Sequence, residues 1–206
     1  MKDTYAEFET DRIIREKYFP NFIGTMVEVG CADPELYSMS MLFRQNNWRC
    51  IGVEPNPFFA EKHRALNHEI YEYAINTKNK KNVDFYMVND YGEGSQFTFE
   101  SMSSLGIQQG YMDKDGTPSN VQIIKVECKT LNSVLKLAEV DKIDFLSIDT
   151  EGWELDVMKS FSTEKYNPKV ILLENYLHLE RYTEYMNRIG YQLDMKVEYN
   201  YLYTKI

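Results

Sequence analysis

Short apolar runs alternate with amphipathic stretches along most of the chain. The runs have the length of buried strands, and the stretches between them place apolar residues at helical spacing. Predicted strands cover 25–30, 48–54, 69–75, 143–149 and 169–175. Predicted helices cover 4–18, 38–46, 57–67, 130–140, 152–161 and 179–190. This alternation is typical of an α/β fold with a parallel, doubly wound sheet.

Two segments depart from the alternation. Within residues 83–128, two further strands flank a long loop rich in Gly, Ser and Asp, and a loop of this length inside a compact domain is usually functional or mobile. Residues 191–206 alternate with a period of two on both sides of Asn200, which predicts a closing antiparallel hairpin. No repeat or linker divides the chain, so we expect one domain over 1–206, with 1–22 as its N-terminal helix and lead-in.

Composition and charge narrow the function classes. The 206 residues are 43% hydrophobic and 14% aromatic, as in a folded globule. Lys and Arg number 23 against 32 Asp and Glu, and the net charge of -9 argues against nucleic acid or an anionic membrane as a partner. The cysteines, Cys31, Cys50 and Cys128, are widely spaced without a CxxC pair, which predicts reduced thiols and no zinc site. With no signal peptide or membrane span recognisable, we expect a cytoplasmic protein.

The stretch "MVEVGCADPELYS", residues 26–38, is typical of the first strand and turn of a nucleotide-binding domain. A dinucleotide fingerprint needs three spaced glycines, but after Gly30 the other two places hold Ala32 and Glu35. Glu28 and Asp33 flank the turn and would repel a diphosphate. An NAD-dependent oxidoreductase is therefore a disfavoured alternative.

S-adenosylmethionine fits these residues better, because it carries positive charge and no phosphate. Glu54 ends the next strand, near the spacing of about 20 residues at which an acid holds ribose hydroxyls. The structural alternative is that the acids of the turn are solvated or capping residues and that Glu54 caps the following helix. Taken together, the acids of the turn and Glu54 each follow a predicted strand at the spacing that a cofactor site requires, which favours the functional interpretation.

A second acidic group follows a later strand. "IDFLSIDTEGWE" leads into Asp149, Glu151 and Glu154 at the sheet edge where ligands bind in open α/β folds. Helix capping is the alternative, but three acids exceed what capping requires. We expect Asp149 to be a general base toward a substrate hydroxyl, and His178 is a further candidate at the end of a late strand. A divalent metal is conceivable at the acids, but a metal-free site is favoured.

These motifs together resemble the FkbM family of S-adenosylmethionine-dependent methyltransferases. The resemblance rests on "VEVGCADPELYSMSMLFRQNNWRCIGVEPNP", "SMSSLG", "IDFLSIDTEGWELDVMKSF" and "VILLENY". It implies a class I methyltransferase fold, with a Rossmann-like sheet of seven strands, the last antiparallel, helices on both faces and an inserted loop between two extra strands. It also implies O-methylation, commonly of a sugar or glycan hydroxyl. Ala32 and Pro34 depart from the commonest pattern, VDVGANxG, whereas Pro34 followed by Ser38 is similar to a subset of the family.

The resemblance also implies roles for individual residues. The cofactor-binding set is Glu28, Gly30, Ala32, Asp33, Ser38, Glu54, Pro55, Asn56, Ala74, Asn76 and Asp149. The catalytic set is Asp149, Glu151 and Glu154, to which its position after a late strand adds His178. The substrate-binding set is Ser103 and Ser104, to which position alone adds Tyr176. The expected partners are a sugar or glycan acceptor and glycosyltransferase domains or enzymes of the same pathway. A non-catalytic glycan- or partner-binding domain that kept the fold remains the main alternative.

Overall fold

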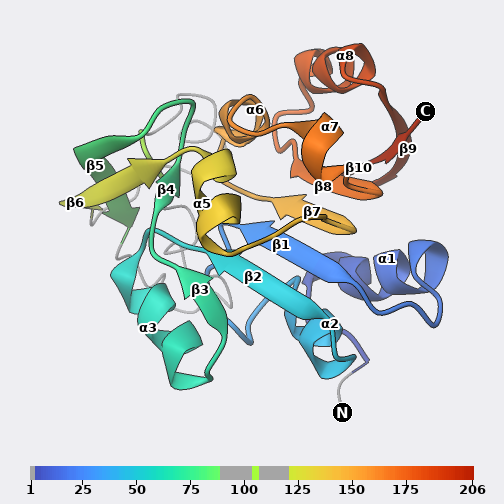
Figure 1. The fold of residues 1–206 in the computed structure, drawn as a ribbon, viewed down its shortest axis with the longest axis horizontal. Helices are drawn as coiled ribbons and strands as arrows, with labels where there is room; N and C mark the ends of the chain where they lie inside the picture. The colour runs from blue at the N-terminus through green and yellow to red at the C-terminus, as the bar shows by residue number, and fades with distance from the viewer. Residues whose placement is uncertain (1–2, 89–103, 107–120) are drawn as a thin grey trace.

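A mostly parallel sheet forms the centre of the protein (Figure 1). The structure is a computed structural model, and it describes residues 3–88, 104–106 and 121–206. The strands of the large sheet are β1 (Thr25–Val29), β2 (Arg49–Val53), β3 (Glu69–Tyr71), β7 (Phe145–Ile148), β8 (Val170–Glu174), β9 (Tyr191–Val197) and β10 (Asn200–Lys205). They form a 7-stranded sheet in the order β3-β2-β1-β7-β8-β10-β9. β10 runs antiparallel to both of its neighbours, and β9 and β10 form the predicted hairpin.

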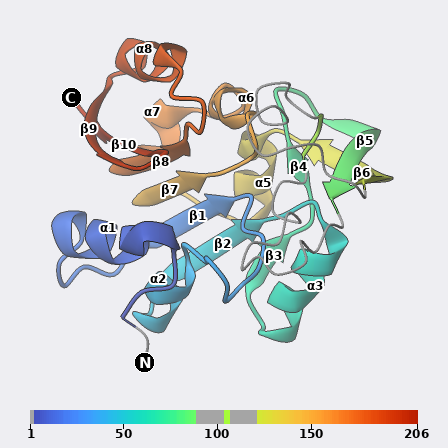
Figure 2. The ribbon, with the colours of Figure 1, turned by 180° about the vertical axis from the view of Figure 1, so that it is seen from behind.

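Helices cover both faces of this sheet (Figures 1 and 2). They are η1 (Glu7–Glu9), α1 (Thr10–Tyr18), α2 (Met41–Gln45), α3 (Pro57–Ala65), α5 (Leu131–Leu137), α6 (Glu154–Met158), α7 (Thr163–Tyr166) and α8 (Glu180–Arg188). Because side chains alternate along β1, Met26 packs in one core with Ile14 of α1, whereas Val27 packs in a second core with Leu135 of α5. The expected α/β class, with a large parallel sheet flanked by helices, is confirmed.

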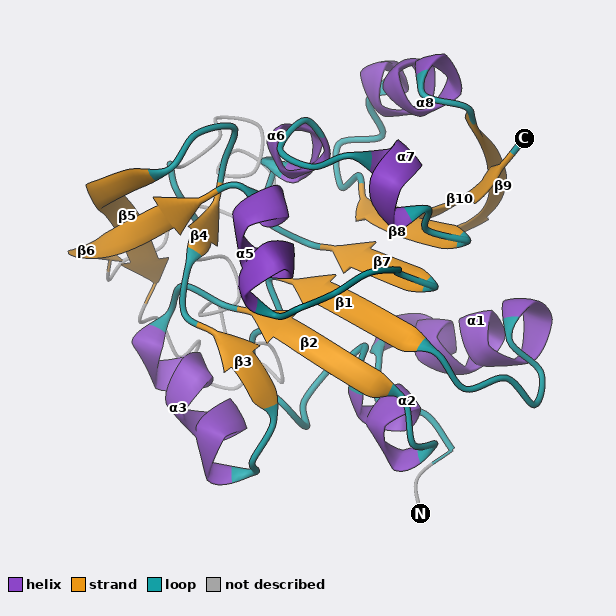
Figure 3. Cartoon of the chain, in the orientation of Figure 1, coloured by secondary structure: helices purple, strands orange, loops and turns teal. Residues whose placement is uncertain are grey.

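A second, smaller sheet lies beside the first (Figure 3). It has the order β4-β6-β5, with β4 at Ala74–Ile75, β5 at Lys80–Val88 and β6 at Val121–Lys129. The prediction of one strand over 69–75 was wrong, because β3 pairs with β2 whereas β4 pairs with β6 of the other sheet. The chain passes from the large sheet to the small sheet at Glu72 and Tyr73, although apolar and polar residues continue to alternate through this segment. Most of the predicted loop lies outside the described residues.

The N-terminal helix begins at Thr10, later than predicted, because the backbone turns sharply before it. Phe8 and Glu9 both have left-handed backbone angles, with φ of 54° and 56°. The Asp11 carboxylate holds the preceding segment by accepting a hydrogen bond of 2.7 Å from the backbone N–H of Tyr5. Residues 6–8 therefore form a bent segment beside the sheet.

None of the helices in the described ranges has the length and apolar character needed to cross a membrane.

Candidate active site

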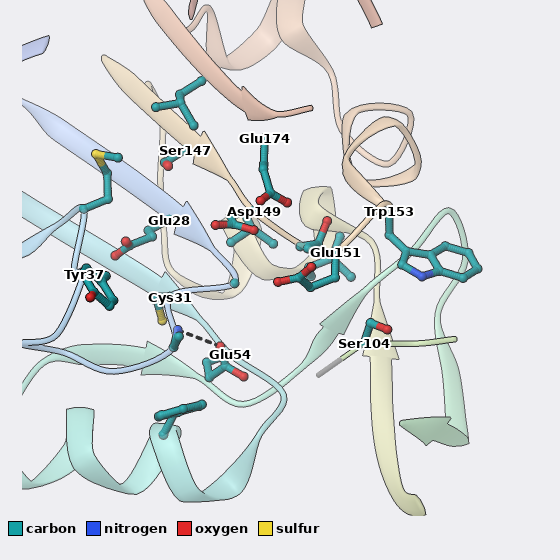
Figure 4. A pocket seen from close by; sticks show the side chains of 18 of the residues that line it. Glu28, Cys31, Tyr37, Glu54, Ser104, Ser147, Asp149, Glu151, Trp153 and Glu174 are labelled. Atoms are coloured by element: carbon teal, nitrogen blue, oxygen red, sulfur yellow. Dashed lines mark hydrogen bonds between the residues drawn. The ribbon is translucent and has the colours of Figure 1, made fainter. Parts of the chain in front are cut away.

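A cavity of about 580 Å³ opens at the carboxyl ends of four adjacent strands. Each of these strands contributes one acid to the lining: Glu28 within β1, Glu54 after β2, Asp149 after β7 and Glu174 at the end of β8. Figure 4 shows the four side chains facing a common space. In open α/β sheets this edge is where ligands bind, and the volume falls in the range of small-molecule sites.

The turn after β1 depends on Gly30. Its φ is +77°, and a Cβ built on it would lie 1.7 Å from the carbonyl oxygen of Asp149. The Gly30 N–H donates a hydrogen bond of 2.9 Å to the carbonyl of Val53, and the Asp149 N–H donates one of 3.0 Å to the carbonyl of Val29. The turns after β1 and β7 are thus packed backbone to backbone, which fixes the position of Asp149 relative to Gly30.

Glu54 holds the first turn from the neighbouring strand. Its Oε2 accepts a hydrogen bond of 3.0 Å from the N–H of Ala32, drawn as a dashed line in Figure 4, and its Oε1 accepts one of 2.8 Å from the N–H of Asn56. Burial raises the pKa of Glu54 to about 7. Each oxygen keeps a second lone pair, so the carboxylate can still accept hydroxyl groups from a ligand.

Glu28 is a buried acid with an unsatisfied oxygen. It is 4% exposed, and its Oε2 has no hydrogen-bond partner among the described residues. Burial raises its pKa to about 7, against the opposing effects of Ser40 and Arg44. Because an unpartnered buried polar atom costs free energy, a hydrogen-bond donor brought to this oxygen would stabilise it.

Asp33 is also at the lining, but its carboxylate is occupied. Its Oδ1 accepts hydrogen bonds from the N–H groups of Glu35 and Leu36, at 2.9 and 3.0 Å, and its Oδ2 accepts one of 2.6 Å from Lys62. Burial opposes ionisation, but the hydrogen bonds from Lys62 and the two N–H groups outweigh it and lower the pKa of Asp33. The Asp33 carboxylate therefore stays ionised, with its charge balanced by Lys62, and its hydrogen bonds order the turn.

Asp149 and Glu174 form a pair of acids across β7 and β8. Asp149 lies deep among protein atoms, yet its side chain is exposed because it faces the open cavity. Burial and the nearby Glu154 carboxylate raise the pKa of Asp149, and burial and Asp149 raise the pKa of Glu174 well above its usual range. A hydrogen bond joins the two side chains, and Glu174 is the member of the pair that more strongly favours its protonated form.

Glu151 and Glu154 take different positions in the turn after β7. Glu154 is fully buried, and its Oε1 accepts hydrogen bonds from the N–H groups of Thr150 and Gly152, at 2.9 and 3.0 Å. Its Oε2 accepts a hydrogen bond of 2.5 Å from the Tyr182 hydroxyl. Glu151, with a strained φ of 55°, lines the cavity (Figure 4). Glu154 thus positions the turn, and Glu151 presents a carboxylate to the ligand space.

A metal ion is poorly suited to these acids. Ligand oxygens of Asp149, Glu154 and Glu174 lie within 4.8 Å of one another, which is close enough for a cation. However, the Glu154 carboxylate already accepts hydrogen bonds from Thr150, Gly152 and Tyr182, and burial and Asp149 raise the pKa of Glu174 well above its usual range. A metal ion would have to compete with these hydrogen bonds and would need Glu174 in its ionised form.

The other predicted site residues divide into two groups. Those that line the cavity are Ala32, Pro55, Ala74, Ser104 and Tyr176. Those that do not line it are Ser38, Asn56, Asn76 and His178. Members of the second group bond to nearby backbone or to another side chain: Asn56 caps α3 through the N–H of Phe58, and His178 contacts the Tyr201 hydroxyl at 3.0 Å. Ser103 lies outside the described residues.

The sequence reasoning missed several lining residues. Glu174 ends an apolar strand, as Asp149 follows one, and the two strands are neighbours. The reasoning that an acid at the end of a buried strand lies at the ligand-binding edge therefore applied to Glu174 as well. Glu7 and Tyr199 had no such signal, because they lie 192 positions apart and meet only in the fold, where the Tyr199 hydroxyl donates a hydrogen bond to Glu7. Trp153, whose indole N–H donates a hydrogen bond to the carbonyl of Gly106 at 3.3 Å, also lines the cavity.

The strand order and the site at the carboxyl ends of the parallel strands define a Rossmann-like α/β protein of the methyltransferase type. A family model, described as the methyltransferase FkbM domain, matches residues 28–193. The chain therefore belongs to the FkbM methyltransferase family, as its motifs predicted, and this membership supports a methyltransferase function. No curated protein matched the chain.

Proposed function

We propose that the protein is an O-methyltransferase that uses S-adenosylmethionine to methylate a hydroxyl of a sugar or glycan. The observation that carries the proposal is the series of acids at the ends of β2, β1, β7 and β8 around one cavity, in a chain of the FkbM family. Three aromatic side chains among the lining residues, Trp153, Tyr176 and Tyr199, support a sugar acceptor, because aromatic rings pack against the apolar faces of sugars while hydroxyls face the acids.

The residues at the first two strands fit the cofactor. Glu54 is placed to accept the ribose hydroxyls, and Ala74 and Pro55 supply apolar surface to the adenosine. The unsatisfied Oε2 of Glu28 suits the α-amino group, and the bare backbone at Gly30 admits a ligand close to the turn. When bound, S-adenosylmethionine supplies an activated methyl group, and its transfer leaves a neutral thioether.

We assign the general base to Asp149. Its carboxylate faces the cavity, so an acceptor hydroxyl can donate a hydrogen bond to it, and the hydroxyl proton passes to Asp149 as the oxygen gains its methyl bond. A hydrogen bond with Glu174 fixes the orientation of Asp149, while Glu154 holds the turn that carries it. Orientation and removal of water from the two reactants supply much of the remaining rate enhancement.

Titration of the protein with S-adenosylhomocysteine in a calorimeter, with NAD as the control ligand, tests this function. We expect S-adenosylhomocysteine to bind and NAD not to bind. Sugar acceptors can then be screened for a mass increase of one methyl group. Binding of NAD alone would favour an oxidoreductase, and binding of neither ligand would contradict the proposal.

Glu54→Ala tests the cofactor end of the site. We expect it to weaken S-adenosylhomocysteine binding by about 1–3 kcal/mol, because it removes an acceptor of ribose hydroxyls and frees the N–H of Ala32. Glu61→Ala is the matched control, since Glu61 is 74% exposed on α3 and pairs with Arg64. Calorimetric dissociation constants of the two variants and the unchanged protein provide the measurement. Equal affinity in all three would remove the ribose assignment.

A further inference from the structure

Helix α3 holds the turn after β1 through two consecutive side chains. His63 Nε2 lies 3.1 Å from the carbonyl oxygen of Ala32, and the neighbouring Lys62 forms the ion pair of 2.6 Å with Asp33. From the other side, Glu54 accepts the hydrogen bond of the Ala32 N–H. Side chains therefore hold both backbone polar groups of Ala32, whose φ of 38° is in the left-handed region that costs an alanine free energy.

The contact with Ala32 determines which nitrogen of His63 carries a proton. His63 is fully buried, and a carbonyl oxygen can only accept a hydrogen bond, so Nε2 must be the donor. Burial and the nearby Arg44 guanidinium lower the pKa of His63, so its ring is neutral at pH 7.5. A neutral imidazole has only one N–H, which leaves Nδ1 of His63 as an acceptor.

A second histidine lies at this acceptor. His68 Nδ1 is 3.1 Å from His63 Nδ1, and because His63 Nδ1 has no proton to donate, the hydrogen bond requires a proton on His68 Nδ1. Burial, Arg44 and His63 lower the pKa of His68 to about 4, so this ring is neutral as well. The contacts thus describe a chain of two hydrogen bonds, from His68 to His63 and from His63 to Ala32.

The end of α3 brings the two histidines together. The helix ends at Ala65, and Asn67 follows with a left-handed φ of 57°. The N–H of Asn67 donates a hydrogen bond of 2.9 Å to the carbonyl of Arg64. The N–H of His68 donates one of 3.0 Å to the carbonyl of His63. These two bonds form a Schellman motif, and the apolar contact that frequently accompanies this motif is replaced here by a hydrogen bond between two imidazoles.

We propose that His63 and His68 are positioning residues of the cofactor site. The Nδ1–H of His68 fixes the tautomer of His63, and the Nε2–H of His63 holds the Ala32 carbonyl in the turn that binds S-adenosylmethionine. This inference rests on the proposed function, because it assigns a role at the site of that cofactor. Neither histidine lines the cavity, so both act through Ala32, which does line it.

NMR of the histidine ring nitrogens tests the chain of hydrogen bonds directly. In two-bond proton–nitrogen correlation spectra at pH 7.5, we expect His63 as the Nε2–H tautomer and His68 as the Nδ1–H tautomer. The signals are assigned by their loss in His63→Gln and His68→Asn. An unconstrained histidine favours the Nε2–H tautomer, so the expected form of His68 is a specific signature. His68 in the Nε2–H form, or His63 protonated on both nitrogens, would overturn the inference.

Replacement of His63 tests the role of its N–H at Ala32. His63→Leu fills the buried space without a donor, and we expect S-adenosylhomocysteine to bind about fivefold more weakly, the effect of one lost neutral hydrogen bond. His63→Gln places an amide N–H near the position of Nε2, so its affinity should stay within about twofold of the unchanged protein. Full affinity in His63→Leu, or equal weakening in both variants, would overturn the role of His63.

His68→Ala removes the second donor and leaves His63 in place. His63 can then adopt the tautomer with a bare Nε2, which repels the Ala32 carbonyl, so we expect about threefold weaker S-adenosylhomocysteine binding. His68→Asn carries an amide N–H near the position of Nδ1 and should restore the affinity. Arg64→Gln is the control, because Arg64 pairs with acids of the surface and does not line the cavity. Full affinity in His68→Ala would overturn the role of His68.

The proposed function and this inference fail in different ways. If the unchanged protein does not bind S-adenosylhomocysteine, the proposed function is overturned, and the role of the two histidines in cofactor binding falls with it. If the unchanged protein and His63→Leu bind S-adenosylhomocysteine equally well, only this inference is overturned.

Discussion

Asp149→Asn is expected to lower the rate of methyl transfer by about 10²–10⁴-fold while S-adenosylhomocysteine still binds. Asparagine has nearly the same shape as aspartate, but its amide cannot take the hydroxyl proton of the acceptor. The side chain faces the cavity and asparagine keeps its size, so the fold should be kept. The measurement is the single-turnover rate of the variant with the best acceptor from the mass screen.

Asp156→Asn is the control for this variant, because Asp156 lies on α6 and pairs with Lys159 away from the cavity. A fully active Asp149→Asn protein would move the base to Glu151 or Glu174. A rate loss shared equally by Asp156→Asn would instead indicate a general disturbance of the turn after β7.

The pH dependence of turnover gives a second signature of Asp149. Burial and Glu154 raise the pKa of this carboxyl, and a general base works only in its ionised form. Turnover by the unchanged protein should therefore rise with pH through the raised pKa and level off above it. Asp149→Asn should lose this rise, whereas Asp156→Asn should keep it.

The sequence predicted the central strands well because their apolar runs are buried on both faces. β8, for example, is buried at every position from Val170 to Glu174. The strand over 69–75 was mispredicted because its alternation continues through Glu72 and Tyr73, whereas the partner strands change there from β2 to β6. Strand pairing is a long-range property, and local alternation does not report it.

The site could be predicted where an acid directly follows a buried strand. Glu54 and Asp149 satisfy this rule, and the structure places both at the cavity. Asn56 and His178 are close to strand ends in the sequence, but their side chains turn to a helix cap and to Tyr201 instead. A position close to a strand end in the sequence therefore predicts that the backbone lies near the site. It does not predict whether the side chain points into the site.

The contact between Glu7 and Tyr199 at the cavity marks the limit of such reasoning. Glu7 reaches the cavity because Phe8 and Glu9 adopt left-handed backbone angles before α1, which an amphipathic pattern over 4–18 does not reveal. Tyr199 reaches it from the turn of the closing hairpin. Their contact depends on the hairpin docking beside β8, so it arises only from the complete sheet.

Gly30→Ala is expected to abolish measurable S-adenosylhomocysteine binding and to lower the free energy of unfolding by about 3 kcal/mol. The added Cβ would lie 1.7 Å from the Asp149 carbonyl oxygen and 2.9 Å from its carbonyl carbon, so the turns after β1 and β7 must separate. That separation also strains the hydrogen bond from Gly30 to Val53 and moves Asp149 relative to Glu54. Urea unfolding and calorimetric titration measure the two effects.

Gly190→Ala separates backbone strain from this steric clash. Gly190 has a similar φ of +83°, but no atom lies within 4 Å of the position of its Cβ. We expect this control to lose only about 1 kcal/mol, the cost of a left-handed alanine, and to keep full ligand affinity. If the two variants were equally stable and bound S-adenosylhomocysteine equally well, the close packing of the two turns would not support the site. A larger loss confined to Gly30→Ala would show that this contact holds the cofactor end and the base in one geometry.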